Sequence, residues 1–245
     1  MRLCFYKSDI AIRGNFLMKI EIKASPKEVK DGHFDYSNME SEYGCNTLYF
    51  TKNGKPYSII AGELHFARLP KERWKETLLK MRECGVNTVS TYVFWNYHEE
   101  IKGEFDFSGN KDIAGFLQLC KEIDMPCILR IGPWCHAEVV YGDFPKRINK
   151  IKKKRTDAPE YLAEVKEYWQ GLYKEVAPYL DGKIVIGIQI DNEYTGPIQH
   201  LLTLKKLAQE IGYKAPFFTM TAWPLSKPDN RLLPLAGGYP DGPWN

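Results

Sequence analysis

The 245-residue sequence contains no apolar run that approaches the roughly 18 residues of a membrane-spanning helix. Its net charge of +3 at pH 7 is too small to predict a nucleic-acid partner. We interpret a basic run at 149–155, NKIKKKR, as a solvated loop. Cysteine is sparse, with no Cys-x-x-Cys pair and no metal-ligand spacing among its six positions. These absences argue against a membrane protein, a nucleic-acid-binding domain and a cysteine-ligated metal site.

The opening residues, MRLCFYKSDIAIRGNF, carry charges inside any apolar stretch, so they do not read as a signal peptide. Cys84 and Cys120 fall in helix patterns and Cys127 in a strand pattern, which predicts that most thiols are buried. Nothing here requires an oxidising compartment, and a cytoplasmic location is the default expectation. No cofactor is implied.

The length and composition fit one large α/β domain, because 44% hydrophobic and 13% aromatic residues are enough for a packed core. The predicted strands are 57–66, 88–95, 126–132, 184–190 and 216–221, with a further one near 233–237. The helices predicted between them are 72–83, 111–123, 161–176 and 196–211. This alternation is typical of a parallel sheet with right-handed crossovers.

The number of strand–helix units limits which α/β architecture the chain can form. A turn at Asn53-Gly54 predicts a β-hairpin just before the alternating region. We divide the chain into an irregular N-terminal extension, residues 1–46, and a domain of residues 47–245. Five to six units fall short of the eight that close a (β/α)8 barrel. We therefore expect an incomplete TIM-type barrel, in which the sheet is open or the chain stops before closure.

Polar and aromatic residues follow the predicted strands, where the ligand crevice of a parallel sheet lies. In GIQIDNEYTG, residues 187–196, a β-branched apolar run ends at Asp191, Asn192 and Glu193. Spacing alone fits a solvated turn that caps the next helix equally well. The residues at the other strand ends are Glu63, His65, Tyr92, Trp95, Asn96, His98, Glu99, Trp134, Cys135, His136, Glu138, Tyr194 and Trp223. Carboxylates, amides and rings on one rim are typical of a sugar site.

The pair His136 and Glu138 forms a His-x-Glu sequence, which also begins one zinc deaminase signature. That signature requires a later Pro-Cys-x-x-Cys, and none follows. We therefore predict no metal site here and interpret His136 as a hydrogen-bonded histidine of the rim.

Five segments in order resemble glycoside hydrolase family 35, the β-galactosidases. They are GELHFARLP (62–70), NTVSTYVFWNYHE (87–99), GEFDFSGNKDI (103–113), LRIGPWCHAE (129–138) and QIDNEYTG (189–196). The resemblance covers roughly residues 45–245 and implies a (β/α)8 barrel, retaining chemistry and an acid/base at Glu193. It also implies that Tyr92, Glu138 and Asn192 bind galactose. The alternatives from the residues alone are a core aromatic for Tyr92 and a structural ion pair for Glu138.

The sequence departs from the pattern of this family at three places. Asp191 stands where relatives usually have Glu, and Gly142-Asp143 stands where they have Gly-Gly. The nucleophile that the resemblance implies is a Glu on a seventh strand, and this chain is expected to end before that strand. Pairing Glu193 with Glu138 as the two carboxylates is an alternative, which the resemblance argues against because it makes Glu138 a hydroxyl binder.

The function that we expect is that of a retaining exo-glycosidase hydrolysing terminal β-D-galactosyl residues, with this chain a truncated and inactive form. The substrate would be a β-galactoside or oligosaccharide, without nucleic acid or membrane as partner. One alternative is a non-catalytic remnant that binds galactose through Tyr92, Glu138 and Asn192. Another is a β-glycosidase of different sugar specificity, since the sequence does not fix the hydroxyl contacts.

Overall fold

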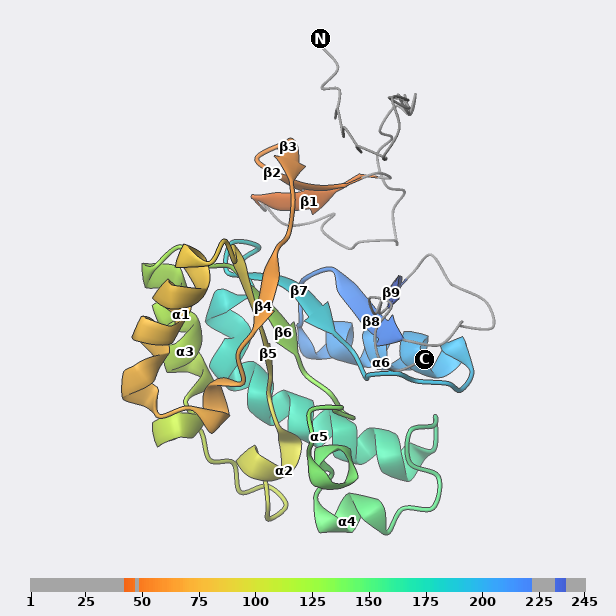
Figure 1. Ribbon diagram of the computed structural model, residues 1–245. Helices are drawn as coiled ribbons and strands as arrows, with labels where there is room; N and C mark the ends of the chain where they lie inside the picture. Colours follow the sequence, from red (N-terminus) through yellow and green to blue (C-terminus); the bar gives the residue numbers. More distant parts are fainter. Residues whose placement is uncertain (1–41, 47–48, 222–231, 237–245) are drawn as a thin grey trace, which may run out of the picture.

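The computed structural model describes residues 42–46, 49–221 and 232–236 (Figure 1). A small antiparallel sheet has the order β1 (Tyr43–Cys45), β2 (Phe50–Lys52) and β3 (Lys55–Tyr57). β2 and β3 form the predicted hairpin, in which Asn53 and Gly54 take left-handed φ values of 50° and 71°. β1 lies in the N-terminal extension, so the prediction of irregular structure there is wrong for its three residues. The division at residue 46 stays a prediction.

The main sheet has six strands within the described residues, and all its pairings are parallel. They are β4 (Ala61–Glu63), β5 (Thr88–Tyr92), β6 (Cys127–Arg130), β7 (Val185–Gln189), β8 (Phe217–Thr221) and β9 (Leu233–Ala236). Their order in space is their order in sequence, which distinguishes this sheet from a doubly wound one. Sequential strands with right-handed crossovers place every connecting helix on one face, as in a (β/α)8 barrel.

Four long helices cover that face (Figure 1). They are α1 (Trp74–Glu83), α3 (Ile113–Glu122), α5 (Pro159–Val176) and α6 (Ile198–Ile211). Local sequence explains their ends. The side chain of Asp112 accepts a hydrogen bond of 2.7 Å from the N–H of Gly115 and so caps α3. Pro159 occupies the first turn of α5, and Gly212, with φ of 121°, ends α6.

Shorter helical turns lie in the loops around the sheet. They are η1 (Phe66–Arg68), η2 (Lys71–Arg73), α2 (Trp95–His98), η3 (Gly109–Lys111), η4 (Val140–Asp143), α4 (Lys146–Asn149) and η5 (Ala177–Tyr179). The predicted strand 88–95 is therefore too long, because β5 ends at Tyr92 and α2 begins at Trp95. Both α2 and η4 follow the carboxyl ends of strands, on the side where the candidate site lies.

Helix α5 fixes the carboxyl ends of two neighbouring strands. Tyr168 Oη donates to the carbonyl of Val93, just after β5, at 2.9 Å. Trp169 Nε1 donates to the carbonyl of Ile131, just after β6, also at 2.9 Å. Both side chains are fully buried, so these bonds satisfy ring donors that water cannot reach. The helix thereby holds in place the chain segments that lead into the site.

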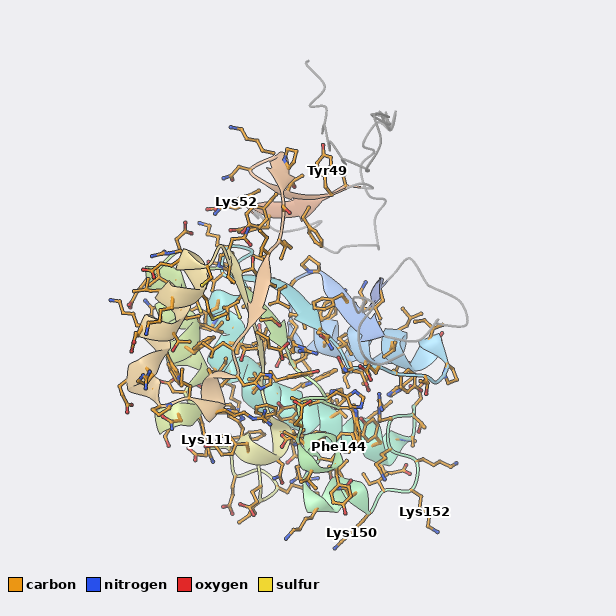
Figure 2. All side chains as sticks on the ribbon, in the orientation of Figure 1. Tyr49, Lys52, Lys111, Phe144, Lys150 and Lys152 are labelled. Atoms are coloured by element: carbon orange, nitrogen blue, oxygen red, sulfur yellow. The ribbon has the colours of Figure 1, made fainter. Side chains whose placement is uncertain are left out.

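The basic loop at 149–155 is solvated only in part. Figure 2 shows Lys150 and Lys152 projecting away from the protein, as expected. Arg155 instead points inward, and its Nη2 lies 2.5 Å from Oδ1 of the buried Asp191. The prediction of a solvated loop is wrong for this residue, because a buried carboxylate needs a cation beside it.

Three of the four cysteines whose side chains are described are buried, and all four are free thiols. Cys120, Cys127 and Cys135 lie in the core, whereas Cys84 is exposed. Within the described segments, no helix combines the length and the apolar character that crossing a lipid bilayer requires.

Candidate active site

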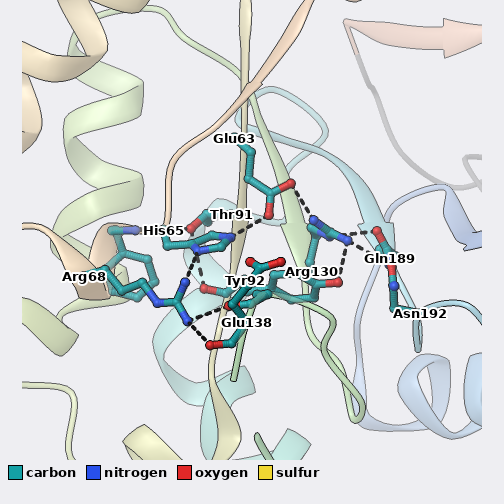
Figure 3. A network of polar contacts seen from close by, with 11 residues as sticks. Glu63, His65, Arg68, Thr91, Tyr92, Arg130, Glu138, Gln189 and Asn192 are labelled. Carbon is teal, nitrogen blue, oxygen red and sulfur yellow. Dashed lines mark hydrogen bonds and ion pairs between the residues drawn. The ribbon is translucent and has the colours of Figure 1, made fainter. Parts of the chain in front are cut away.

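Arg130, the last residue of β6, is the centre of the polar network in Figure 3. Its Nε donates to Oε1 of Gln189 at 2.8 Å, and its Nη1 donates to Oε2 of Glu63 at 2.5 Å. Its Nη2 donates to the hydroxyl of Tyr92 and, at 2.9 Å, to Oδ1 of Asn192. These partners come from β4, β5, β7 and the residues after β7. A single guanidinium therefore aligns the ends of four neighbouring strands.

Tyr92 is fully buried, and its ring lies 3.7 Å from the Arg130 guanidinium carbon. Burial raises the pKa of its phenol well above the usual value, although the charge of Arg130 opposes this. The phenol therefore keeps its proton. Because arginine only donates hydrogen bonds, the Tyr92 oxygen is the acceptor, and this bond leaves the hydroxyl hydrogen unused. Tyr92 is thus both a core aromatic and a polar group of the network.

Asn192 has one defined side-chain orientation. Gln189 donates from Nε2 to Asn192 Oδ1 at 2.7 Å, in addition to the bond from Arg130. With Oδ1 occupied by two donors, Nδ2 of Asn192 faces His136, 2.9 Å from its Nδ1 atom. Asn192 and Asp191 are 3% and 1% exposed, so the solvated-turn alternative is wrong for both residues.

The backbone that follows β7 is strained. Asp191 and Glu193 have φ values of 54° and 47°, a left-handed conformation that costs about 1–2 kcal/mol for a residue with a side chain. Arg155 offsets this cost. Its Nη2 donates to Asp191 Oδ1 at 2.5 Å and to the carbonyl of Asn192 at 2.8 Å. Strained residues held in this way are often found at functional sites.

Glu193 lies at the mouth of the sheet with 32% of its side chain exposed. Its Oε2 atom is 3.4 Å from Nδ1 of His136. Trp134 Nε1 lies 3.0 Å from the other ring nitrogen of His136, Nε2. His136 is therefore the hydrogen-bonded rim histidine that the sequence predicts, and it joins Glu193 to Asn192.

Glu138 has a left-handed φ of 50° and lines a cavity of about 520 Å³. The cavity is lined by Glu63, Leu64, His65, Arg68, Leu69, Arg130, His136, Ala137 and Glu138. Arg68 fixes the loop by donating to the carbonyl oxygens of Ala137 at 2.6 Å and Glu138 at 3.4 Å. In the described part of the chain, no cation pairs with the Glu138 carboxylate, so the structural ion pair considered from sequence is not formed there. The volume suits a small ligand.

Glu63 faces the same cavity from β4. Burial acts to raise the pKa of its carboxyl, but the hydrogen bond from His65 and the charge of Arg130 outweigh burial and lower it. The carboxylate is therefore ionised and balances the guanidinium. His65 Nε2 lies 2.6 Å from Glu63 Oε1, and Arg68 Nη1 lies 3.2 Å from His65 Nδ1 (Figure 3).

The structure thus joins Tyr92, Asn192 and Glu193 in one network and places Glu138 on the same cavity as His136. Sequence reasoning missed Arg130 and Gln189 as site residues. The available signal was a charged and an amide side chain at the ends of two otherwise apolar strands. Trp223 lies outside the described residues.

The described residues offer no metal or thiol chemistry at this site. Among them, no three His, Cys, Asp or Glu side chains converge in a way that could hold a metal ion. Burial raises the pKa of the Cys135 thiol well above its usual value, so this cysteine stays protonated and unreactive.

Solved structures share this fold. An exo-β-1,4-mannosidase from Opitutaceae bacterium strain TAV5 superposes with a TM-score of 0.56 at 16% identity, over 74% of this chain and 34% of that one. A glycoside hydrolase named GH5_18 from Bifidobacterium longum gives 0.52 at 10% identity, over 68% and 45%. These identities are evidence for the fold alone. The chain is an α/β protein of the TIM-barrel type, of which the described residues supply six strands.

The model of glycosyl hydrolases family 35 matches residues 49–231, and the chain belongs to this family. A β-galactosidase of Xanthomonas manihotis is 40% identical over 62% of this chain and 26% of its own length. Beta-galactosidase 17 of Arabidopsis thaliana is 34% identical over 80% and 30%. Mouse beta-galactosidase-1-like protein 3 is 37% identical over 69% and 26%. The chain spans roughly a quarter of the length of these curated relatives.

Proposed function

We propose that this chain supplies the proton-donor half of a retaining β-galactosidase site, with Glu193 as the acid/base. The observation that carries the proposal is the position of Glu193 after β7, with Oε2 3.4 Å from His136 and next to the fixed amide of Asn192. A half-exposed carboxyl on the rim of a buried polar network can reach a bound glycoside and exchange protons with water.

Tyr92, Glu138 and Asn192 bind the hydroxyl groups of the sugar in this proposal. Tyr92 offers an O–H donor, Glu138 an acceptor without a cation partner in the described chain, and Asn192 an amide held by Arg130 and Gln189. Glu138 lines the cavity of about 520 Å³, and Arg130, which lines it too, holds Tyr92 and Asn192 beside it. Fixed donors and acceptors give a polyhydroxylated ring its orientation. β-Galactosides are the proposed substrate class because the relatives that this chain resembles are named β-galactosidases.

Retaining hydrolysis needs a second carboxylate about 5–5.5 Å from the first, which attacks the anomeric carbon. The family resemblance implies a nucleophile on a seventh strand, whereas the described sheet contains six. We therefore expect the 245-residue chain to bind galactose and to leave β-galactosides uncleaved. An external anion can replace the missing nucleophile: azide bonds to C1 as the C1–O bond breaks, and Glu193 gives its proton to the leaving oxygen.

The experiment has a binding arm and a catalytic arm. Galactose, glucose and N-acetylglucosamine are titrated onto ¹⁵N-labelled protein, and the indole resonance of Trp134, which bonds His136, reports occupancy. Galactose should shift this resonance most, and Asn192→Ala should abolish the shift. In the second arm, an alkyl β-galactoside with sodium azide should yield α-galactosyl azide with wild-type protein and none with Glu193→Gln.

Each outcome decides a part of the proposal. No response of Trp134 to any sugar overturns it. Equal azide products from wild type and Glu193→Gln exclude Glu193 as the acid. Micromolar galactose binding without azide product supports the sugar-binding alternative instead. Hydrolysis without azide that Glu193→Gln abolishes places a nucleophile within these residues, and Glu138→Gln then tests whether it is Glu138.

A further inference from the structure

The segment η4, Val140–Asp143, carries two unusually exposed apolar side chains on the rim of the site. Val140 is 76% exposed and Tyr141 is 70% exposed, the highest values among the large hydrophobic residues of the described chain. Single exposed apolar residues need no explanation, but two adjacent ones beside a polar cavity mark a contact surface.

This segment is rigid, so the exposure is not a result of a loosely held loop. The carbonyl of Gly142 accepts from the N–H of Cys135 at 3.1 Å, and Asp143 Oδ2 accepts from the N–H of Asn96 at 2.9 Å. Gly142 is packed so tightly on the ring of Trp134 that a Cβ atom there would lie 2.2 Å from it. The two residues that directly follow the exposed pair are therefore fixed to the body of the protein.

The backbone of Tyr141 is held in an unfavourable conformation. Its φ of 53° is left-handed, which costs an aromatic residue about 1–2 kcal/mol. Folding recovers none of this cost by burying the ring, because the ring stays in water. A strained residue with an exposed ring beside a cavity is consistent with a ligand contact.

Tyr141 lines a second cavity, of about 340 Å³. This cavity is lined by Trp134, Cys135, His136, Ala137, Glu138, Val139, Tyr141 and Gly142. His136, Ala137 and Glu138 line the first cavity as well, so the two cavities meet at these three residues. His136 also contacts Glu193, which places the proposed proton donor near the boundary.

We infer that the second cavity is an acceptor subsite, in which Tyr141 stacks on the sugar ring that leaves when the galactoside is cleaved. The inference rests on the proposed function and adds the class of leaving group, a saccharide. An aromatic face packs on the apolar face of a pyranose, and the polar atoms of His136 and Glu138 bind its hydroxyls. Because the two cavities share three lining residues, we expect the second cavity to hold a sugar ring that is covalently joined to the galactose in the first.

The test compares galactose with lactose on the 245-residue chain, with the Trp134 indole resonance as the readout. Lactose should bind more tightly than galactose to wild-type protein. Tyr141→Ala should weaken lactose binding about three- to tenfold and leave galactose binding unchanged. Tyr141→Phe keeps the stacking ring and should bind as wild type. Tyr49→Ala is the matched control, since Tyr49 is an exposed tyrosine beside the small antiparallel sheet, at the far end of the molecule (Figure 2).

The two ligands separate the two hypotheses. Galactose that fails to shift Trp134 in wild-type protein overturns the proposed function itself. Galactose binding with no advantage for lactose overturns the acceptor subsite alone, as does an equal effect of Tyr141→Ala on both ligands. A loss of lactose binding in Tyr141→Phe equal to that in Tyr141→Ala would assign the effect to the hydroxyl and exclude stacking.

Discussion

The Nδ1 atom of His136 lies 3.4 Å from Oε2 of Glu193 and 2.9 Å from Nδ2 of Asn192. Asn192 Nδ2 can only donate, because Asn192 Oδ1 already accepts from Arg130 and Gln189. His136 Nδ1 can bond this amide only as an acceptor. A protonated Glu193 can donate its O–H to the same nitrogen, whereas a Glu193 carboxylate would present a second acceptor. The imidazole is thus arranged to receive hydrogen bonds from both site residues.

This arrangement predicts the tautomer of His136. Two donors, Asn192 Nδ2 at Nδ1 and Trp134 Nε1 at Nε2, compete for the single accepting nitrogen of the neutral ring. We expect the proton on Nε2, because the buried Asn192 N–H would otherwise lose its acceptor at a cost of about 1–3 kcal/mol, whereas the exposed Trp134 N–H can bind water instead. Two-bond ¹⁵N–¹H spectra of the ring measure this. Asn192→Asp replaces the donor by an acceptor and should move the proton to Nδ1. His98, whose ring contacts the carbonyls of Phe94 and Lys111, is the internal control. A proton on Nδ1 in wild-type protein contradicts the prediction.

Replacing Arg130 by lysine should disconnect the site. Lysine keeps the charge but cannot reach Glu63, Tyr92, Gln189 and Asn192 together, because it lacks the planar fork of five donors. We expect a loss of about 2–4 kcal/mol in the free energy of unfolding, together with the loss of galactose binding. Urea denaturation and the Trp134 resonance measure the two effects.

A matched control for this change is Arg82→Lys. Arg82 makes an exposed bond of 2.8 Å to the carbonyl of Ile123, away from the site. Its replacement should alter the unfolding free energy by less than about 0.5 kcal/mol. If both variants unfold alike, the buried network contributes nothing particular to stability.

Arg155 should matter far more than the lysines of its own loop. Arg155→Ala leaves the buried Asp191 carboxylate without its cation, and we expect a loss of about 3–5 kcal/mol in the free energy of unfolding. Lys153→Ala, an exposed neighbour, should change it by less than about 0.5 kcal/mol. Adding Asp191→Asn to Arg155→Ala should restore part of the stability. An absence of recovery in that double variant would exclude the unpaired charge as the cause.

Asp143 should make the stability of the protein depend on pH. Burial raises the pKa of this carboxyl to about 7, although the N–H groups of Asn96 and Tyr97 act to lower it. The unfolded chain loses the proton near pH 4, whereas the folded chain keeps it up to about 7. Stability should therefore fall as pH rises between these values, by at most about 4 kcal/mol.

The Asp143→Asn variant tests this directly. The amide keeps an acceptor oxygen for Asn96 and removes the charge, so the variant should be more stable than wild type at pH 8 and similar to it at pH 4. Thermal unfolding across this range measures the difference. Glu100→Gln, at an exposed carboxylate, is the control and should not alter the slope. An unchanged slope in Asp143→Asn would assign the pH dependence to other groups.

Much of the fold could be predicted because its signals are local. Apolar periodicity located β6, β7, α3 and α5, and Gly212 ended α6 as expected. The strand at 233–236 and its parallel pairing were also anticipated from the alternation. The errors occurred where tertiary contacts override local preference. Trp95 lies in an apolar run that predicts a strand, yet it begins a helical turn and its ring stacks on Tyr168.

The candidate site was predictable only in part, for a related reason. Tyr92, Glu138, Asn192 and Glu193 could be singled out because polar residues at strand ends break an apolar pattern and because the motifs resemble a family. Nothing local distinguishes Arg155 from the lysines before it, since its contact with Asp191 joins residues 36 positions apart. Nothing local revealed the central role of Arg130 either, because its partners lie on or just after three other strands.

The sequence by itself determined the order of strands and helices and the residue types available at the carboxyl ends of the strands, because these follow from short-range patterns of side chains. Only the tertiary structure decided which polar groups pair, how Asn192 is oriented and which nitrogen of His136 faces Glu193. Hydrogen bonds act over about 3 Å, and only the folded sheet brings residues from distant parts of the chain within that range.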